Sequence, residues 1–307
     1  MTVTQADRCL NGWLVVDKPK GLSSNRVVEL VRRLTRTKVG HAGTLDPLAT
    51  GVLPLALGEA TKTVAYAMSS CKRYRFRICW GVARATDDCE GAIIGESTSR
   101  PSREQIEAIL PRFTGTVLQQ PPVYSAIKVD GRRAYALARA STPPALPHRL
   151  VQIAALRLIA VPDPDHADCE AVVGKGTYIR ALARDLALAL ETVGHVVELR
   201  RLTVGPFSQS QAISLDSIAE CRHNLVDSGY LLPIETALEN IPALALTAGE
   251  AARLRCGQRV TLADVGEQAH LHHLDEGTVV AAWHAHAVVA LARIDNGGLR
   301  PVRVINR

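Results

Sequence analysis

GHAGTLDPLATGVLP, residues 40–54, is the stretch from which the rest of this 307-residue sequence is best interpreted. It presents one carboxylate, Asp46, among glycines and threonines, with His41 five residues earlier and Pro47 directly after the acid. This composition predicts loop structure from Val39 to Gly58 in place of a regular element. The residues alone leave two interpretations of Asp46 open: a catalytic carboxylate on a loop, or an Asp-Pro pair that begins a turn.

Regular elements are predicted on both sides of this loop. WLVVD at 13–17 predicts a buried strand, and Ser23 or Ser24 predicts the cap of a helix with apolar residues at 27, 30, 31 and 34. KRYRFRICW at 72–80 alternates, which predicts a strand with Arg73, Arg75 and Arg77 free on one face and the aromatic residues on the other. Later segments predict helices at 102–110 and 179–190 and strands at 168–173 and 196–204.

The C-terminal part of the sequence differs in character from the rest. Short strand-like runs at 258–262, 278–283, 287–294 and 301–304 are separated by glycines, which is typical of a small β-barrel. We therefore expect two domains, residues 1–240 and residues 241–307.

Composition and charge restrict the class of protein. The sequence is 47% hydrophobic and 21% charged, has no apolar run long enough for a membrane span, and begins without a secretory signal. Its seven cysteines form no CxxC pair, which indicates reduced thiols and a cytoplasmic location. Residues 1–80 hold 13 Lys/Arg against 5 Asp/Glu, whereas residues 241–307 hold 7 against 6. The basic N-terminal part is compatible with a nucleic-acid partner or with an ordinary solvated surface.

Metal and phosphate-loop chemistry find little support in the sequence. No Walker-type loop and no HExxH segment is present. His270, His272 and His273 are close together, but no acidic or thiolate ligand accompanies them at a firm spacing, so no metal site is predicted.

The segment GHAGTLDPLATGVL closely resembles the catalytic motif of the TruB-type bacterial tRNA pseudouridine synthases, in which the aspartate is essential. Six further stretches resemble the same family in the same order, and together they span most of residues 13–207. They are DKPKGLSSN (17–25), GEATK (58–62), KRYR (72–75), QPPVYSAIK (120–128), KGTYIRALARDL (175–186) and LRRLTVGPF (199–207).

This resemblance assigns roles to individual residues. Asp46 is implied to act on the ribose of the target uridine, either by attacking the anomeric carbon or by removing a ribose proton. Arg180 is implied to be the partner of that carboxylate, and Tyr74 to stack on the target base after it has been flipped out of the RNA. His41 is implied to fill the space that the flipped nucleotide leaves, and Tyr178 to form a second wall of the pocket.

A further set of residues is implied to bind the RNA through positive charge. Such contacts are individually interchangeable, since each places a cation beside a phosphate. The set comprises Lys62, Lys128, Lys175, Arg200 and Arg201, together with Lys18, which resembles the lysine of the family's first motif and for which a structural role is equally open.

One segment departs from the family pattern. Residues 84–91 read RATDDCEG where a TDTxDxxG-like segment is usual, so Arg84 and Ala85 replace Thr-Asp. Ala85 removes a carboxylate that could have supported Arg180, which puts the surroundings of that arginine in question.

The resemblance also implies the fold and the reaction. We expect an α+β fold, with a mixed, mainly antiparallel sheet, flanking helices and a small PUA-like C-terminal β-barrel. The expected reaction converts uridine-55 in the T-arm of tRNA to pseudouridine, with no cofactor, because it conserves atoms. We expect a monomer that needs no protein partner.

Three alternatives remain. They are an RNA-binding protein that remodels tRNA without catalysis, a hydrolase with Asp46 as nucleophile, and a guide-RNA-dependent synthase acting on ribosomal RNA.

Overall fold

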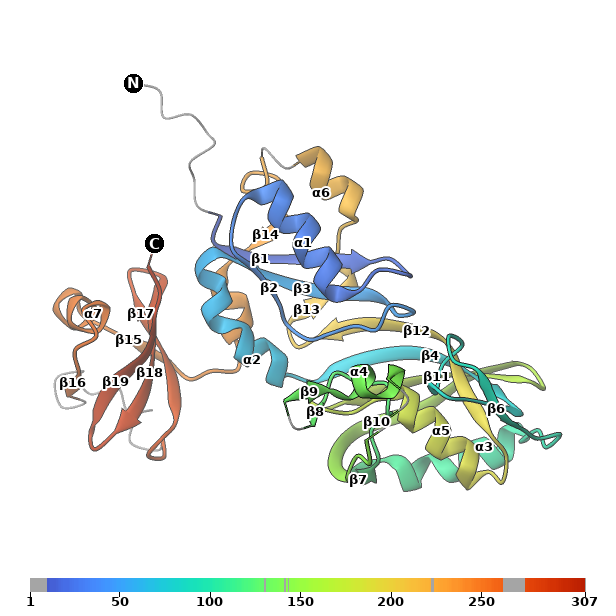
Figure 1. The fold of residues 1–307 in the computed structure, drawn as a ribbon. Coiled ribbons are helices and arrows are strands. Elements are labelled where there is room, and N and C mark those ends of the chain that lie inside the picture. Colours follow the sequence, from blue (N-terminus) through green and yellow to red (C-terminus); the bar gives the residue numbers. More distant parts are fainter. Residues whose placement is uncertain are drawn as a thin grey trace.

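One large mixed sheet organises most of the chain (Figure 1). The computed structural model describes residues 10–129, 131–140, 142, 144–221, 224–261 and 274–306. The main path of the sheet follows the order β14-β1-β3-β12-β4-β11-β10-β7, with β2 paired to β3 and β13 to β12. Its pairs are antiparallel except for β12 with β3. The strands are β1 (Gly12–Lys18), β2 (Val39–His41), β3 (Thr50–Leu57), β4 (Lys72–Trp80), β7 (Gly115–Gln119), β10 (Arg149–Asp163), β11 (His166–Val173), β12 (Gly194–Val204), β13 (Phe207–Ser208) and β14 (Leu231–Leu232).

Four helices share one hydrophobic core with this sheet. They are α1 (Ser24–Thr35), α3 (Arg103–Ile109), α5 (Ile179–Ala189) and α6 (Leu215–Cys221). The apolar spacing of α1 places Val27 and Val31 in the core, and its N-cap is Ser23, as the sequence predicts. The capping box predicted at Ser102 begins α3. Strand β4 turns Phe76 and Ile78 into the core and leaves Arg73 and Arg75 exposed, so its predicted alternation is confirmed.

The prediction of loop structure across residues 39–58 is wrong. Strands β2 and β3 occupy much of this segment, and residues 51–57 of β3 pair with β1. Residues 51–57 of β3 are buried on both faces of the sheet, so the strand shows no alternation of apolar and polar residues. Proline has no amide hydrogen to donate to a neighbouring strand. Pro54 is accommodated because β3 changes its neighbour there: Gly51 pairs with β12, whereas Leu55 pairs with β2.

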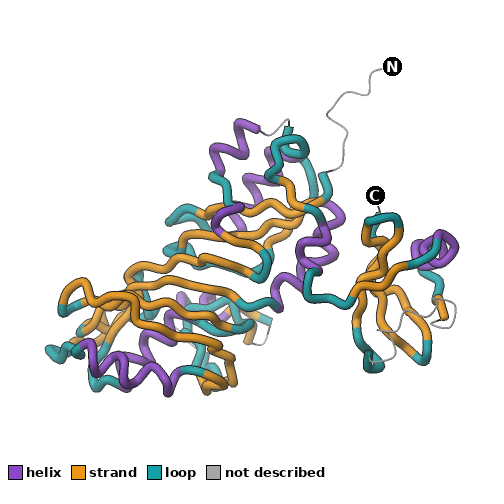
Figure 2. Tube along the Cα trace, turned by 180° about the vertical axis from the view of Figure 1, so that it is seen from behind, coloured by secondary structure: helices purple, strands orange, loops and turns teal. Residues whose placement is uncertain are grey.

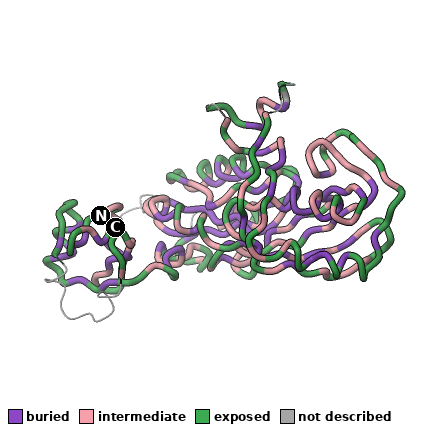
Figure 3. Tube along the Cα trace, turned by 90° about the horizontal axis from the view of Figure 1, so that it is seen from below, coloured by how far each residue is buried: buried purple, intermediate pink, exposed green. Residues whose placement is uncertain are grey.

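A second core joins the large sheet to the C-terminal part of the chain. It combines Trp13 and Val15 of β1 and Phe207 of β13 with Leu291 and Ile305 from the C-terminal part. The 3₁₀ segments η2 (Gly58–Thr63) and η5 (Ile234–Leu238) and helix α2 (Val64–Ser69) lie in this region. Figure 3 shows that buried residues occur in both the larger body and the C-terminal part of the chain, with exposed residues mainly along loops and edges.

The C-terminal part forms a separate five-stranded sheet in the order β15-β17-β18-β19-β16 (Figure 2). Its strands are β15 (Ala243–Ala245), β16 (Val260–Thr261), β17 (Val279–His284), β18 (Ala287–Asp295) and β19 (Gly298–Val304). Helix α7 (Ala248–Arg255), which the sequence did not predict, begins with a capping box formed by Thr247 and Glu250. The fold is thus α+β with a smaller, curled C-terminal sheet, as expected.

Shorter elements extend from the large sheet as hairpins and turns. Strands β5 (Val82–Arg84) and β6 (Ile93–Glu96) form one hairpin, and β8 (Lys128–Val129) and β9 (Arg132–Arg133) form another, followed by α4 (Ala134–Arg139). The 3₁₀ segments η3 (Leu110–Phe113) and η4 (Gln209–Gln211) complete the regular elements of the described residues. No helix in the described part of the chain is both long and apolar enough to span a membrane.

Candidate active site

Asp46 lies in a turn between β2 and β3. The Ala49 amide donates to the Asp46 carbonyl over 3.1 Å, with Pro47 at the second position of the turn. The turn interpretation of the Asp-Pro pair is therefore correct for the backbone. The side chain remains about one-third exposed, and its Oδ2 accepts a hydrogen bond from Arg180 Nε over 2.9 Å. The carboxylate is thus both fixed and accessible.

Groups from the start of the chain fix the backbone on either side of Asp46. The Ser24 hydroxyl donates to the Leu45 carbonyl over 3.0 Å and accepts from the Leu45 amide over 2.7 Å. The Pro47 carbonyl accepts from the Gly21 amide over 2.8 Å and from Lys18 Nζ over 3.4 Å. The helix start at α1 and the turn after β1 therefore determine where the carboxylate stands.

Arg201 of β12 passes beneath the same loop. Its guanidinium donates to the carbonyls of Val52 (2.8 Å), Gly43 (3.0 Å) and Thr44 (3.4 Å), and it lies 3.5 Å from the Tyr74 hydroxyl. Arg201 is fully buried and has backbone carbonyls as its acceptors. It therefore holds the loop in place, and Tyr74 stands beside the backbone that leads to Asp46.

Arg180 is the centre of the polar network around Asp46. It is almost completely buried near the start of α5, and it donates through Nη1 to the Thr86 carbonyl over 2.7 Å and through Nη2 to the Tyr124 carbonyl over 3.0 Å. Asp88 lies 3.4 Å from Nη1 as a second carboxylate. With every nitrogen engaged, the guanidinium has one orientation, and Nε points at Asp46.

The departure at Ala85 does not leave Arg180 without a supporting acid. Asp88 is buried, and its Oδ1 accepts from the Thr86 hydroxyl and from the Glu90 amide over 3.0 Å. Its other oxygen faces Arg180. Asp88, which the segment shares with the family pattern, therefore supports Arg180 although Ala85 carries no carboxylate.

Two further groups near the loop have lowered pKa values. Burial lowers the pKa of Lys18 to about 8, an effect that Asp46 opposes and the Arg201 guanidinium adds to. Burial and then Arg201 lower the pKa of the His41 imidazole. His41 is therefore neutral at physiological pH, and its buried Nδ1 has no hydrogen-bond partner within the described structure.

Tyr178 stands immediately before α5. The buried side-chain amide of Gln119 accepts from the Tyr178 amide over 2.9 Å and donates to its carbonyl over 3.2 Å. The Arg149 guanidinium lies 5.0 Å from the centre of the Tyr178 ring, a cation–π distance. This brings Tyr178 to the same helix terminus as Arg180.

The cations that were expected to bind phosphate have three different environments: buried, paired with an acid, or exposed. Lys18 is buried, and its Nζ also donates to the carbonyls of Pro19 and Leu22. Lys62 is paired with Glu59 at 2.6 Å and reaches the Val304 carbonyl of the C-terminal sheet. Arg200 forms a two-point ion pair with Asp17. Lys128 and Lys175 are exposed on the surface.

The exposed arginines of β4 are also partly committed, so the expectation that they are free is wrong. Arg77 binds both carboxylate oxygens of Asp168. Arg73 and Arg75 lie 4.0 Å and 3.6 Å from Glu170. Alternation correctly predicted the face on which these arginines lie, but the acidic residues come from the neighbouring strand β11, which a one-strand pattern does not include.

Several groups that build the site had no predicted role in it, although Ser24 was predicted as a possible helix cap. Asp88, Gln119 and Ser24 are examples, since each acts through a buried contact with a residue far away in the chain. The signal available was that Ser24 lies inside a recognised motif and Asp88 inside the departing segment, whereas Gln119 directly precedes the motif at 120–128.

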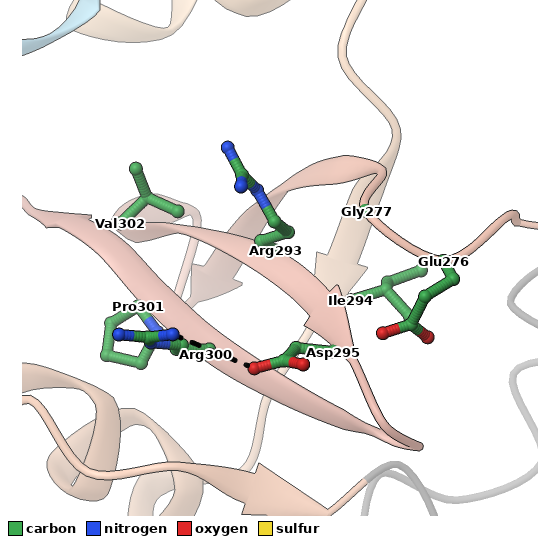
Figure 4. A pocket seen from close by; sticks show the side chains of 8 residues that line it. All are labelled: Glu276, Gly277, Arg293, Ile294, Asp295, Arg300, Pro301 and Val302. Carbon is green, nitrogen blue, oxygen red and sulfur yellow. Dashed lines mark ion pairs between the residues drawn. The ribbon is translucent and has the colours of Figure 1, made fainter.

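A shallow depression of about 520 Å³ lies on the C-terminal sheet (Figure 4). Arg293 and Arg300 line it together with the acidic Glu276 and Asp295, and Arg300 and Asp295 are 3.9 Å apart. Its charges are mixed, and none of its lining residues belongs to the Asp46 network.

Metal ligands do not gather in the described residues, where no group of three or more His, Cys, Asp or Glu side chains is placed to hold an ion. The cysteines described by the structure are unpaired. His270, His272 and His273 lie outside the described residues.

Comparison with known sequences identifies relatives along the whole chain. Residues 31–179 match the family model "TruB family pseudouridylate synthase (N terminal domain)", and residues 180–239 match "tRNA pseudouridylate synthase B C-terminal domain". A Rhodospirillum rubrum protein named tRNA pseudouridine synthase B is 50% identical over 307 residues, covering both chains completely. A protein of the same name from Caulobacter vibrioides is 50% identical over 297 residues, or 96% of each chain.

Solved structures share the fold at much lower sequence identity. A chain from "Crystal Structure of a Cbf5-Nop10-Gar1 Complex" has a TM-score of 0.75 at 22% identity, covering 98% of this chain and 87% of that one. A chain from "Structure of H/ACA RNP bound to a substrate RNA containing 2'-deoxyuridine" has a TM-score of 0.74 at 21% identity, covering 97% and 86%. On the strength of the family models and the full-length relatives, the chain belongs to the TruB family of pseudouridylate synthases.

Proposed function

We propose that the protein converts a uridine in the T-loop of tRNA to pseudouridine, with Asp46 as the catalytic carboxylate. The observation that carries this proposal is the ion pair of Asp46 with Arg180, in which a buried cation holds a partly exposed carboxylate. The names of the full-length relatives support tRNA as the substrate class.

The reaction breaks the bond between N1 of the base and C1′ of the ribose and forms a new bond between C5 and C1′. The hydrogen on C5 leaves as a proton, and N1 gains one, so atoms balance without a cofactor. Asp46 acts at the ribose, either as a nucleophile at C1′ or as a base on a ribose proton. Both roles use the ionised carboxylate, and the Arg180 guanidinium stabilises that charge directly.

The target base must leave the RNA stack to reach Asp46, because a stacked uridine is inaccessible to a side chain. We propose that Tyr74 stacks on the flipped base, since its partly buried side chain packs against the main core and its hydroxyl lies beside Arg201. Tyr178 provides the second wall beside Arg180, and neutral His41 occupies the space that the base vacates.

The cations have two separate functions in this proposal. Lys18 and Arg201 hold the Asp46 loop through backbone carbonyls. The exposed Lys128 and Lys175 meet phosphates of the T-arm, whereas Lys62 and Arg200 contribute after exchanging part of their present ion pairs. The C-terminal residues 241–307 form a PUA-like domain that adds RNA contacts.

We also propose that the protein acts as a monomer in the cytoplasm, without a protein partner or a guide RNA. The support is that one chain supplies the carboxylate, its guanidinium partner and every group that holds them.

The test is the release of tritium from C5 of a tRNA transcript made with [5-³H]uridine, because forming the C5–C1′ bond expels that hydrogen. The parent protein should release one equivalent per tRNA. Asp46→Asn should lower the rate by at least about 10⁴-fold, since it removes the charge that acts on the ribose, while tRNA affinity stays nearly the same.

Asp165→Asn is the matched control, because Asp165 pairs with Arg100 at the surface, away from the loop. It should retain the parent rate. If Asp46→Asn released tritium near the parent rate, the assignment of the catalytic carboxylate would be wrong.

A further inference from the structure

Helix α5 carries two arginines one turn apart that contact the same two segments of the chain. Arg180 donates through Nη1 to residue 86 and through Nη2 to residue 124. Arg184 repeats this arrangement: its Nη1 binds Asp87 Oδ2 over 2.8 Å, and its Nη2 donates to the Gln120 carbonyl over 2.7 Å. Two guanidinium groups therefore connect residues 86–88 with residues 120–124 across one face of α5.

The Nε atoms of the two arginines also have equivalent acidic partners. Nε of Arg180 binds Asp46, and Nε of Arg184 binds Asp185 over 2.9 Å. Only Arg180 reaches the reacting region. Arg184 is the outer member, with about a quarter of its side chain exposed.

Asp87 is placed for this contact by its backbone. Its φ of 57° lies in the left-handed region, which is uncommon for residues other than glycine but accessible to aspartate. The Asp87 amide donates to the Arg84 carbonyl over 3.0 Å, and its own carbonyl accepts from the Val196 amide over 3.1 Å. Consecutive aspartates thereby serve different arginines: Asp87 binds Arg184, and Asp88 faces Arg180.

The pKa of Asp87 reflects its burial beside Arg184. Burial raises the pKa of the Asp87 carboxyl, and Arg184 and then Arg180 oppose that rise. Without Arg184, this carboxylate would remain largely buried beside Arg180 and would compete with Asp46 for its positive charge.

We propose that Arg184, through its contacts with Asp87 and Gln120, is a positioning residue that fixes the orientation of Arg180 toward Asp46. The inference rests on the proposed function. Three of the four contacts that orient Arg180 come from residues 86, 88 and 124, and Arg184 fastens these same segments to α5. Residues 86–88 belong to the segment that differs from the family pattern at Arg84 and Ala85.

The test measures single-turnover tritium release from a [5-³H]uridine-labelled T-arm stem–loop, alongside the Kd for that RNA. Arg184→Gln should lower the single-turnover rate constant by roughly 10- to 100-fold, because small misplacements of a catalytic group have effects of that size. The Kd should change by less than about threefold, since all three guanidinium nitrogens of Arg184 are already engaged by groups of the protein itself.

Two further variants separate positioning from general destabilisation. Arg184→Lys should restore part of the rate, because the ammonium keeps a charge for Asp87 but lacks the planar fork that also reaches Gln120. Asp87→Asn combined with Arg184→Gln should be no slower than Arg184→Gln alone, as expected for two partners in one contact.

Arg103→Gln is the matched control, since Arg103 pairs with Glu107 on the surface of α3. It should retain the parent rate and thermal stability. The inference is overturned if Arg184→Gln matches the parent rate. It is also overturned if the rate loss only follows a loss of folded protein, without rescue by Arg184→Lys. A parent protein that releases no tritium would instead contradict the proposed function.

Discussion

Three cations that lie within sequence motifs bind the protein's own backbone in the folded structure. They are Lys18, Arg180 and Arg201. Each is buried, and each donates to backbone carbonyls of segments far away in the chain. Only Arg180 also reaches the side chain of Asp46. At the residue scale, the site is therefore a carboxylate bound by one buried cation, on a loop whose backbone two further buried cations hold.

Lys18 should make stability depend on pH in a specific window. The folded protein loses this proton near pH 8 and the unfolded chain near 10.5, so the unfolded chain binds more protons between these values and stability rises with pH. Relative to Lys18→Met, the parent should gain about 2 kcal/mol of unfolding free energy between pH 7 and pH 9.5.

Urea unfolding of both proteins at the two pH values measures this difference. Groups other than Lys18 titrate in both proteins and cancel in the comparison. Equal pH dependence in the parent and in Lys18→Met would show that the buried ammonium does not have a lowered pKa.

Residue identities could be predicted from the sequence where a motif was present, and their contacts could not. Asp46 and Arg180 are paired as the resemblance implied. The sequence did not show that Asp88 would support Arg180 or that Lys18 would be buried, because both outcomes depend on three-dimensional packing between distant segments.

At the scale of elements, strand β3 is a closely packed part of the structure around the site. It is buried on both faces and lies between β1 and β12, and the loop with Asp46 leads directly into its first residue. Gly51 allows this approach: its φ is +99°, and an added Cβ would lie 2.2 Å from the Arg201 carbonyl oxygen. The backbone of β12 can come this close only to a glycine.

Gly51→Ala should therefore destabilise the protein by about 3 kcal/mol or more, through strain at positive φ together with a backbone clash. Gly249→Ala in α7 is the matched control, because that glycine is exposed and has open space around its Cβ position. It should stabilise the protein by roughly 0.5–1 kcal/mol.

Thermal or urea unfolding of the two variants checks this contrast. A Gly51→Ala protein as stable as the parent would mean that β3 and β12 do not approach as closely as described.

Sequence patterns predicted elements with one buried face and missed those without one. Strand β4 and helices α1, α3 and α5 were predicted because their apolar spacing and caps are local signals. Strand β3 was missed because burial on both faces removes the alternation, and its glycine and proline suggested a loop. Helix α7 was missed although its capping box, Thr247 with Glu250, is a local signal.

At the scale of the whole molecule, the two sheets are connected by shared packing and by hydrogen bonds. Besides the second core, Glu59 accepts from the Asn306 amide and Glu235 from the Val288 amide. The excess of positive charge in residues 1–80 is partly neutralised, because the β4 arginines lie beside acids of β11. The electrostatic attraction for RNA therefore depends on the remaining exposed cations and should weaken with salt.

The most direct test of the central claim is to map pseudouridine in an unmodified tRNA transcript after incubation with the purified protein and no added cofactor. Carbodiimide treatment followed by primer extension gives a stop at each pseudouridine. We predict a single new stop at the T-loop uridine, absent with Asp46→Asn and with a transcript carrying cytidine at that position. Tight tRNA binding with no stop, or stops at other uridines, would contradict the proposal that this site isomerises the T-loop uridine.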